Sequence, residues 1–450
     1  MVYLPHWPIP STLGKCQIDY ETVFERMSIV LEKLNNPHQK LPPIIHVTGT
    51  NGKGSTASLL AKIFTTAGYK THLYTSPHLH DCNERIVLNS EKISDNFLYE
   101  IMEEVRIAAD STPLTFMEGF TIGAFLAFSK VPADIVIIEC GMGGRIDATN
   151  IIEKKLASVI TPISFDHTEY LGNSIERIAL EKAMIMRAGT PLIVASQPSA
   201  AKEIIKILAN DQKIDSYFYD EDFAIAIDDE TAEFDLEFFG KKQNFNLNDL
   251  PKPALQGKHQ YINFATAIAT ILAIKEQNPD LFKIEQNHIN SAISSVYWPS
   301  RIEKVQNNLN KILKNSESEI WIDGAHNAAG AFSLARWLID TKSEKKTFVI
   351  VGFSRNKCKK EFLEKFINVA DEIVAVRVDG EPYPEKSEII AEIGRSIATS
   401  TNTKIFAAED LLDAIYYIGK SCEESPCRIV ICGSLHLARD VRKFGNVILF

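Results

Sequence analysis

Short apolar runs alternate with helix-length amphipathic segments through most of the chain. This alternation predicts βαβ units and a mostly parallel sheet. Three near-continuous apolar runs in the first half are typical of strands covered on both faces, at residues 43–48, 134–139 and 157–162. A second series follows residue 298, with strands expected at residues 319–322, 347–351, 372–378 and 428–432. Amphipathic segments between these later strands predict helices at residues 331–341, 361–370 and 410–420.

The two series predict an α/β protein of two domains. The first spans residues 1–298, and the second, a smaller Rossmann-like domain, spans residues 299–450. The boundary falls at WPSR, where Pro299 interrupts the preceding helical pattern. Residues 214–253 depart from the alternation, because aromatic and acidic residues alternate there as they do in antiparallel strands or hairpins. We expect this segment to form a β-rich appendage at the edge of the first domain.

Composition narrows the class of protein. The 450 residues are 45% hydrophobic and 24% charged, which is typical of a globular chain that buries sizeable cores. The formal net charge of −10 argues against binding to nucleic acid or to anionic membranes. No apolar run approaches the roughly 18 residues of a spanning helix, and the N-terminus lacks a signal-peptide pattern. The seven cysteines are scattered without a C-x2-C pair, so we favour buried thiols over a metal site and expect a reduced, cytoplasmic protein.

A glycine-rich segment, GTNGKGST, joins the first predicted strand to a helix predicted at residues 55–67. Glycines let backbone N–H groups crowd around phosphate oxygens, and a helix N-terminus favours negative charge. Lys53 can neutralise terminal phosphates, and Ser55 or Thr56 can face a metal ion. Gly54 separates the lysine from the hydroxyl, which departs from the Walker spacing, and a bare turn is the alternative interpretation. The order of elements favours a nucleotide loop formed by Gly49, Thr50, Asn51, Gly52, Lys53, Gly54, Ser55 and Thr56.

The other two strands of the first half also end in polar residues. Glu139 ends the strand at residues 134–139, and Asp166 and His167 follow the strand at residues 157–162. Ligands of parallel α/β sheets bind beyond the carboxyl ends of the strands, so the three endings together predict a site. An acid at the end of a buried strand beside a phosphate loop is the expected position for a Mg²⁺ ligand. The glycines that follow Glu139 form either a loop that exposes its backbone or only a turn.

Lys182 falls on the apolar stripe of the helix predicted after Gly172, a stripe formed by Ile175, Ile178, Ala179, Ile185 and Met186. A lysine that points inward is costly unless it is paired or modified. On this helix alone, a side chain that extends its ammonium to solvent is the simpler interpretation. If the helix lies beside a metal site, the favoured interpretation is that Lys182 is a functional residue.

Polar residues also follow two strands of the second half. WIDGAHN places Asp323 and His326 after the strand at residues 319–322, and GSLH, with Ser434, follows the strand at residues 428–432. Isolated histidines are more often structural than catalytic. Two polar strand ends within one Rossmann-like domain nevertheless predict a second ligand surface.

These motifs together resemble those of the bacterial bifunctional dihydrofolate synthase/folylpolyglutamate synthase, within the Mur ligase superfamily. The resemblance covers almost the whole chain in the same order, through HVTGTNGKGST, TSPHL, FMEGFT, ECGMGGRIDATN, DHTEYLG, EKA, GKHQYINFATA, WPSRIE, DGAHN and CGSLH. It implies a P-loop-type ATP-binding central domain at residues 1–298, a glutamate-ligase domain at residues 299–450, and a monomer. It also implies an ATP-dependent amide ligase that adds L-glutamate to dihydropteroate and to reduced folates through an acyl phosphate.

The resemblance carries over residue by residue. The loop around Lys53 would hold the phosphates of ATP, with His259, Gln260, Asn263, Arg301 and Asp323 around the nucleotide. Two Mg²⁺ ions are implied, with ligands from Ser55, Ser76, Glu139 and His167. Lys182 matches a lysine that carries a CO2-derived carbamate in the family, which would explain an inward-facing amine. Lys53, Lys182 and His326 are the candidate catalytic residues.

The resemblance also assigns the organic substrates. His326 and Ser434 align with residues near the incoming glutamate, and the pterin-side region matches Phe116, Thr121, Asp147 and Ala148. Met117 and Met184 depart from the family pattern beside these segments. The alternatives are a folylpolyglutamate synthase only, another Mur-type ligase, or a non-catalytic nucleotide switch. A cell-wall Mur ligase usually carries an additional N-terminal domain, for which a loop at residue 49 leaves no room, and a switch would not need Lys182.

Overall fold

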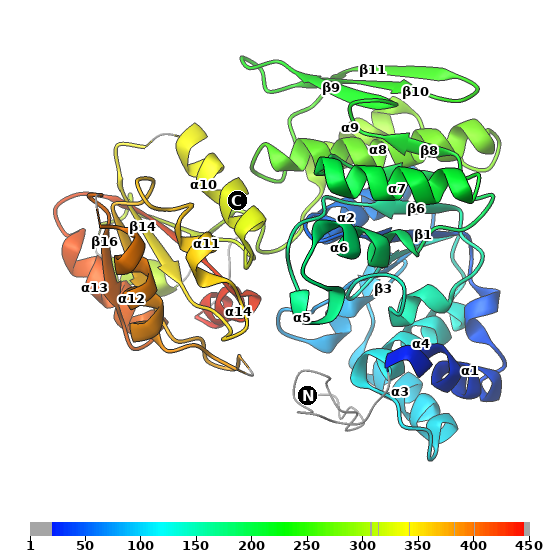
Figure 1. The fold of residues 1–450 in the computed structure, drawn as a ribbon, viewed down its shortest axis with the longest axis horizontal. Coiled ribbons are helices and arrows are strands. Elements are labelled where there is room, and N and C mark those ends of the chain that lie inside the picture. Colours follow the sequence, from blue (N-terminus) through cyan, green and yellow to red (C-terminus); the bar gives the residue numbers. More distant parts are fainter. Residues whose placement is uncertain are drawn as a thin grey trace. The chain divides into compact units, whose positions relative to one another are not determined.

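The computed structural model describes residues 20–444 except 307, 314, 342, 382 and 400. The chain divides into two compact α/β units, one formed by residues 1–254 and 260–297 and the other by residues 255–259 and 298–450 (Figure 1). We call them unit 1 and unit 2. The predicted fold class, a two-domain α/β protein with mostly parallel sheets, is confirmed.

An eight-stranded sheet forms the centre of unit 1. Its strands in spatial order are β4 (Glu91–Lys92), β3 (Ile86–Leu88), β2 (Thr71–Tyr74), β5 (Ile135–Glu139), β1 (Ile44–Thr48), β6 (Ala157–Ile160), β7 (Leu192–Val194) and β8 (Ser216–Phe218). All neighbours from β2 to β8 pair in parallel, whereas β3 and β4 extend one edge as antiparallel strands. The predicted parallel order of the three apolar runs is therefore correct.

Helices bury apolar faces against this sheet. The core on one face joins α1 (Val23–Lys33), α3 (Asp95–Ala109) and α4 (Phe116–Lys130) to Ile44, Val136 and Ile138. A second core joins α6 (Ile175–Ala183) and α7 (Ser199–Asp211) to β6 and β7. The remaining helices of this part are α2 (Lys53–Thr66), α5 (Thr168–Leu171), α8 (His259–Gln277) and α9 (Gln286–Ser295). Of these, α2 packs on β5 and on α9.

Local sequence signals set the ends of several helices. Thr115 and Glu118 form a capping box at the start of α4, and Ser174 caps α6 by accepting the Arg177 N–H. Glu118 also pairs with the buried guanidinium of Arg26 in α1 at 2.7 Å, so this cap connects two helices. Short 3-10 helices span Tyr20–Thr22, Pro37–Lys40, Cys82–Arg85, Ala148–Ile151 and Asn308–Lys311.

A separate antiparallel sheet confirms the β-rich appendage of unit 1. It has the order β11 (Asn244–Leu250), β10 (Phe234–Phe239) and β9 (Phe223–Ile227), drawn in green in Figure 1. The prediction is wrong at its beginning, because β8 does not join the appendage. Tyr217 and Phe218 are buried, and this strand pairs in parallel with β7 at the edge of the main sheet.

The sheet of unit 2 has six strands. Their spatial order is β12 (Glu303–Val305), β13 (Glu319–Ile322), β17 (Cys427–Cys432), β14 (Lys346–Val351), β15 (Glu372–Ala375) and β16 (Lys404–Ala407), with only β12 antiparallel. The helices are α10 (Ala328–Asp340), α11 (Lys359–Leu363), α12 (Ser387–Ile397), α13 (Leu411–Ser421) and α14 (Leu435–Lys443).

One predicted helix of unit 2 is too long. The helix expected at residues 361–370 is only α11, which ends at Leu363. Beyond it the Phe366 and Val369 N–H groups bond to carbonyls three residues earlier, and Asn368 has a left-handed φ of 67°. The strand expected at residues 372–378 likewise ends at Ala375. Within the described part of the chain, none of the helices combines the length and apolar character needed to cross a bilayer.

Candidate functional site

β5, β1 and β6 lie side by side in the sheet of unit 1 and run parallel. Their carboxyl ends therefore meet at one edge, where residues 49–56 follow β1 and Glu139 ends β5. The chain beyond β6 also meets this loop, since two loop N–H groups donate to the Pro162 carbonyl at 3.0 and 3.2 Å. β2 is the next strand, and Ser76 beyond it donates its backbone N–H to Glu139 Oε2 at 3.2 Å. The three predicted strand endings are thus brought together.

Two glycines let the loop pack more closely than any side chain would allow. Gly49 has a φ of 147°, and a Cβ there would lie 1.9 Å from Thr161 Oγ1. Gly52 has a φ of 86°, and a Cβ there would lie 2.2 Å from Oδ1 of Asn263. The Lys53 ammonium turns back over the loop and donates to two of its carbonyls at 3.2 Å. The loop therefore holds its backbone and its lysine in the arrangement expected for binding phosphates.

The hydroxyl of Ser55 supports a metal site at this edge. Ser55 lies in the first turn of α2, and its Oγ is buried without a hydrogen-bond partner among the described residues. A buried polar atom without a partner is costly, and a bound cation would satisfy it. Glu139, at the neighbouring strand end, is only 4% exposed. Hydroxyl and carboxylate oxygens are ligands that Mg²⁺ accepts, so these residues fit that ion.

The other predicted metal ligands lie around the same edge. A Cβ on Gly141 would lie 3.6 Å from Ser76 Oγ, so this hydroxyl faces the loop that follows Glu139. His167 begins α5 with a left-handed φ of 49°, and its side chain is 43% exposed. Its Nε2 lies 4.0 Å from Asp166 Oδ2. No cluster of three His, Cys, Asp or Glu side chains occurs among residues that the structure describes, so a metal here would depend partly on hydroxyl and nucleotide oxygens.

Lys182 points into the protein, as its place on the apolar stripe predicts. It is 3% exposed, and its Nζ donates to the Gly49 carbonyl at 2.8 Å. Burial, and secondarily the nearby Lys53 ammonium, lowers the pKa of Lys182 to about 7. Such a lysine is about half neutral at pH 7, whereas an ordinary lysine is almost entirely charged. The fold therefore places a nucleophilic amine directly beneath the nucleotide loop.

The segment GMGGRIDATN after β5 packs against the last turn of α6. A Cβ on Gly144 would lie 2.8 Å from the Glu181 carbonyl, and the Arg145 N–H donates to the same carbonyl at 2.8 Å. Asp147 is buried, and its two oxygens accept the backbone N–H groups of Met142 and Thr149 at 2.9 and 3.0 Å. The loop that carries Asp147 is thus rigid and adjoins the helix that carries Lys182.

The other predicted pterin-side residues differ in accessibility. The ring of Phe116 packs beside Phe120 with centroids 5.5 Å apart, and Ala148 is 8% exposed. Thr121 is fully buried, and its hydroxyl pairs with the Tyr74 hydroxyl at 3.1 Å. Thr121 therefore belongs to the core beneath this region, and direct contact of these residues with a substrate stays a prediction.

In unit 2, the two predicted polar strand ends are neighbours because β13 pairs with β17. The Gly433 N–H donates to the Ala325 carbonyl at 2.7 Å, which joins DGAHN to GSLH. Asp323 accepts the N–H groups of Ile302 and Ala325 at 2.8 and 2.7 Å, and burial raises the pKa of its carboxyl. The Arg301 guanidinium donates to the Ser300 carbonyl at 2.9 Å.

The structure also describes the surroundings of five further candidates. Nδ1 of His326 lies 2.8 Å from the Gly324 carbonyl, and Ser434 caps α14 while its hydroxyl donates to Glu381 at 2.9 Å. Burial, and then Arg301, lowers the pKa of His259 to about 4. In unit 1, the Asn263 side-chain amide donates to Gln260 at 3.0 Å. Their roles toward nucleotide or glutamate stay predictions.

Comparison with known protein families shows to which family this chain belongs. The family model described as the Mur ligase middle domain matches residues 47–271, half of the chain. The chain belongs to the Mur ligase family. The model described as the dihydrofolate synthetase C-terminal domain matches residues 305–444 of this Mur ligase.

Similar proteins cover nearly the whole chain. A dihydrofolate synthetase of Saccharomyces cerevisiae is 28% identical over 95% of this chain and 98% of its own. A dihydrofolate synthase/folylpolyglutamate synthase of Bacillus subtilis is 29% identical over 96% of both. The structure of E. coli FolC in complex with DHPP and ADP has a TM-score of 0.82 and 26% identity, over 96% of this chain and 95% of that one. The protein is an ATP-dependent ligase of this group, whose members include a yeast protein and are therefore not confined to bacteria.

Sequence reasoning missed Arg85 of this Mur ligase. Its buried guanidinium lies over the ring of Phe116 at 5.4 Å and donates to His78 Nδ1 at 2.8 Å. Arg85 is 6% exposed, and this burial lowers the pKa of its guanidinium. His78 lies in the TSPHL segment, but no local spacing connects it to Arg85, so only the folded chain reveals the pair.

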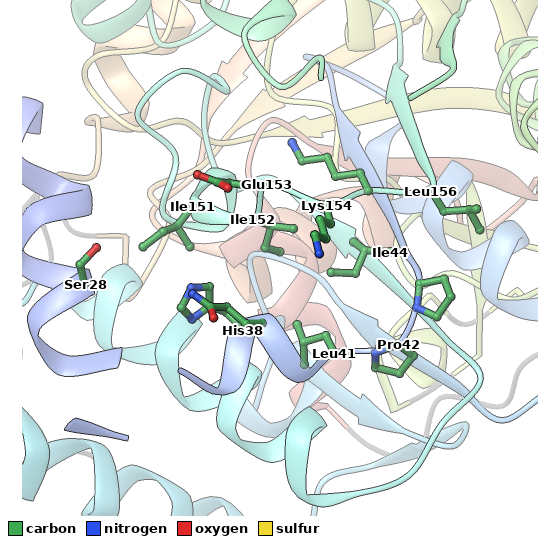
Figure 2. Close-up of a pocket in the computed structure, with 13 residues that line it drawn as sticks. Ser28, His38, Leu41, Pro42, Ile44, Ile151, Ile152, Glu153, Lys154 and Leu156 are labelled. Atoms are coloured by element: carbon green, nitrogen blue, oxygen red, sulfur yellow. The ribbon is translucent and has the colours of Figure 1, made fainter. Parts of the chain in front are cut away.

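A cavity of about 720 Å³ lies at the opposite edge of the same sheet (Figure 2). Its lining includes Ile44 at the start of β1 and Leu156 just before β6, with His38 and Lys154 nearby. This edge holds the amino ends of the parallel strands, about 16 Å from the nucleotide loop along β1. None of the predicted site residues lines this cavity, so it is not part of the candidate site.

The close approach of Gly52 to Asn263 can be tested with a matched pair of variants. Gly52→Ala should weaken Mg-ADP binding at least about tenfold, because the new Cβ would push the loop away from Asn263. Gly68 has nearly the same φ, 89°, but open space around a Cβ, so Gly68→Ala should keep ADP affinity within about twofold. Isothermal titration calorimetry measures both, and equal losses in the two variants would contradict the proposed loop geometry.

Proposed function

We propose that the protein is a glutamate ligase that acts on folates. In this proposal it joins the amino group of L-glutamate to the carboxylate of dihydropteroate, and it also extends reduced folates. The observation that carries the proposal is the single sheet edge where the phosphate loop, Glu139 and the buried amine of Lys182 meet. Relatives named dihydrofolate synthase/folylpolyglutamate synthase, and the FolC complex with DHPP and ADP, support the choice of substrates.

The reaction would proceed in two transfers. The acceptor carboxylate attacks the γ-phosphoryl group of ATP, and a bond to ADP breaks as the acyl phosphate forms. The amine of glutamate then attacks the acyl carbon, loses a proton and displaces inorganic phosphate. Both transfers build negative charge on oxygens, and Lys53 supplies a fixed positive charge at the loop. Holding the reactants together at one edge supplies the proximity contribution to rate.

Magnesium fits this proposal. Ser55, Ser76, Glu139 and His167 would hold two Mg²⁺ ions, and the unpartnered hydroxyl of Ser55 is the observation that supports a cation there. Bound Mg²⁺ would neutralise phosphate charge and polarise the phosphoryl oxygens. The chain's own contribution is to hold Glu139 in place through the Ser76 N–H and to bury it away from competing solvent.

The domain at residues 299–450 would bind glutamate through His326 and Ser434. The Nδ1 of His326 donates to the Gly324 carbonyl in the tautomer that leaves the basic lone pair on Nε2. That lone pair is the candidate acceptor for the amine proton, a general-base role that histidine often has in enzymes. We further propose that the protein is cytoplasmic, which the scattered cysteines support, and that it is a monomer, as the family resemblance implies.

The choice of acceptor is tested by product formation with purified protein. With Mg-ATP and L-glutamate, we expect glutamylated product and phosphate from dihydropteroate, and also from tetrahydrofolate. Mass spectrometry identifies the product, and Lys53→Met measures contaminating activity because it removes the positive charge of the loop. Product with tetrahydrofolate alone would leave a folylpolyglutamate synthase only. Product with neither acceptor would refute the folate proposal.

We also propose that Lys182 carries a CO2-derived carbamate. Only the neutral amine reacts with CO2, and burial maintains that form near neutral pH. The modification would turn a buried cation into an anion beside the proposed metal ligands, which removes its repulsion with Lys53. Without it, the Lys182 ammonium would be buried against the Gly49 carbonyl and a second lysine.

Carbamylation can be observed directly by NMR with ¹³CO2. At constant dissolved CO2, a carbamate signal should rise as pH passes through about 7, since the neutral fraction of Lys182 rises there. Lys182→Met should abolish the signal. Lys155→Met is the matched control, because Lys155 is a half-buried lysine whose pKa is also lowered to about 7, mainly by desolvation. A wild-type protein without the signal, or a signal lost only in Lys155→Met, would refute the proposal.

A further inference from the structure

A buried hydroxyl lies between β1 and the carboxylate of Asp147. The Oγ1 of Thr149 forms a short hydrogen bond with Asp147 Oδ1 and lies 2.8 Å from His46 Nε2. Thr149 is 1% exposed and His46 is fully buried. His46 is a residue of β1, so these contacts connect residues 103 positions apart in the sequence. The function proposed above uses neither Thr149 nor His46.

The direction of these hydrogen bonds follows from their chemistry. Each oxygen of Asp147 accepts a backbone N–H, so the carboxylate acts as an acceptor, and the single proton of Thr149 goes to it. The Nε2 of His46 also lies 3.0 Å from Cys140 Sγ. Toward the Thr149 oxygen, whose proton goes to Asp147, this Nε2 acts as the donor. The Nδ1 of His46 is buried and has no hydrogen-bond partner among the described residues, which suits a neutral ring without a proton there. Burial lowers the pKa of His46 well below its ordinary value and keeps it neutral.

The same strand also holds the other end of the loop. His46 and Thr48 lie on one face of β1, because side chains two residues apart along a strand point the same way. Thr48 donates its hydroxyl to the Gly143 carbonyl at 2.5 Å. β1 then continues directly into Gly49 and the nucleotide loop. One strand thus fixes the nucleotide loop at its end and the Asp147 loop on its face.

The carboxylate that Thr149 holds faces the proposed reaction site. A Cβ on Gly141 would lie 3.3 Å from Asp147 Oδ2 and 3.6 Å from Ser76 Oγ, so Oδ2 lies toward the edge that carries the proposed metal ligands. Oδ1 accepts both the N–H and the hydroxyl of Thr149, whereas Oδ2 accepts one hydrogen bond from the described residues, from the Met142 N–H. A carboxylate oxygen with one acceptor position left suits one N–H group of an amino-oxopyrimidine ring.

We propose that Thr149, supported by His46, is a positioning residue for the acceptor substrate. It would set the orientation of Asp147 so that Oδ2 accepts one N–H group of a pterin acceptor. The inference rests on the proposed function. Because β1 holds both loops, correct placement of the acceptor ring would also align its carboxylate with the γ-phosphoryl group. Loss of the hydroxyl should therefore affect the acceptor, while the nucleotide loop stays in place.

The test compares three variants by steady-state kinetics in the full-length protein. Thr149→Val removes the hydroxyl at constant shape and should raise the KM for dihydropteroate about tenfold, because a hydrogen bond to a charged group is lost. The KM for Mg-ATP should stay within about twofold, and Thr149→Ser, which keeps the hydroxyl, should restore the wild-type KM for dihydropteroate. Thr270→Val is the control, since Thr270 is an equally buried threonine whose hydroxyl donates only to the Thr266 carbonyl of α8, at 2.8 Å.

Each outcome decides the inference. An unchanged KM for dihydropteroate in Thr149→Val, or equal losses for ATP and acceptor that serine does not restore, would overturn it. If Thr149→Val does not fold, His46→Phe replaces it in the test, because this change removes the group that donates to the Thr149 oxygen. His46→Phe should raise the KM for dihydropteroate about threefold, and an unchanged KM for dihydropteroate in this variant would overturn the inference. If the wild-type protein is inactive on dihydropteroate, dihydropteroate is not its acceptor. The same variants are then compared by their KM for tetrahydrofolate, which decides whether Thr149 positions the acceptor. Inactivity with both acceptors refutes the proposed function itself.

Discussion

All five residues of β1 are buried, and the strand pairs in parallel with β5 on one side and β6 on the other. A shift of one residue in either pairing would turn every buried side chain to the wrong face, so the register is strongly specified. That register fixes where the nucleotide loop, Glu139 and the segment after β6 meet. It also sets His46 and Thr48 under the loop that carries Asp147. The geometry of the candidate site therefore follows from the sheet.

Burial then decides which groups at this edge are reactive. Lys182 is neutral enough to act as a nucleophile because it lies in the interior beside a second cation. Cys140, immediately after Glu139, responds in the opposite way, since burial raises the pKa of its thiol to about 12. The same low-dielectric environment thus activates an amine and inactivates a thiol, because the neutral form is the nucleophile in the first case and not in the second.

Much of this could be predicted from the sequence where periodicity or motif order decides the structure. The inward position of Lys182 and the polar ends of parallel strands are of this kind, and both are confirmed. The helix predicted beyond Leu363 is wrong because the chain there turns through hydrogen bonds to carbonyls three residues earlier, and Asn368 has a left-handed φ. The contact of Thr149 with His46 could not be predicted, since periodicity assigns His46 to a face of β1 but does not say which distant loop packs on that face. The unpartnered Ser55 hydroxyl likewise exists only in the folded chain.

The central claim is that the first turn of α2 and the end of β5 together hold the metal of the bound nucleotide. The most direct measurement is anomalous X-ray scattering from Mn²⁺ in crystals of the protein with ADP. The account predicts a manganese peak within bonding distance, about 2.2 Å, of both Ser55 Oγ and a Glu139 oxygen, with the ADP phosphates in the loop at residues 49–56. Manganese bound only away from these two residues, with ADP present, would contradict it.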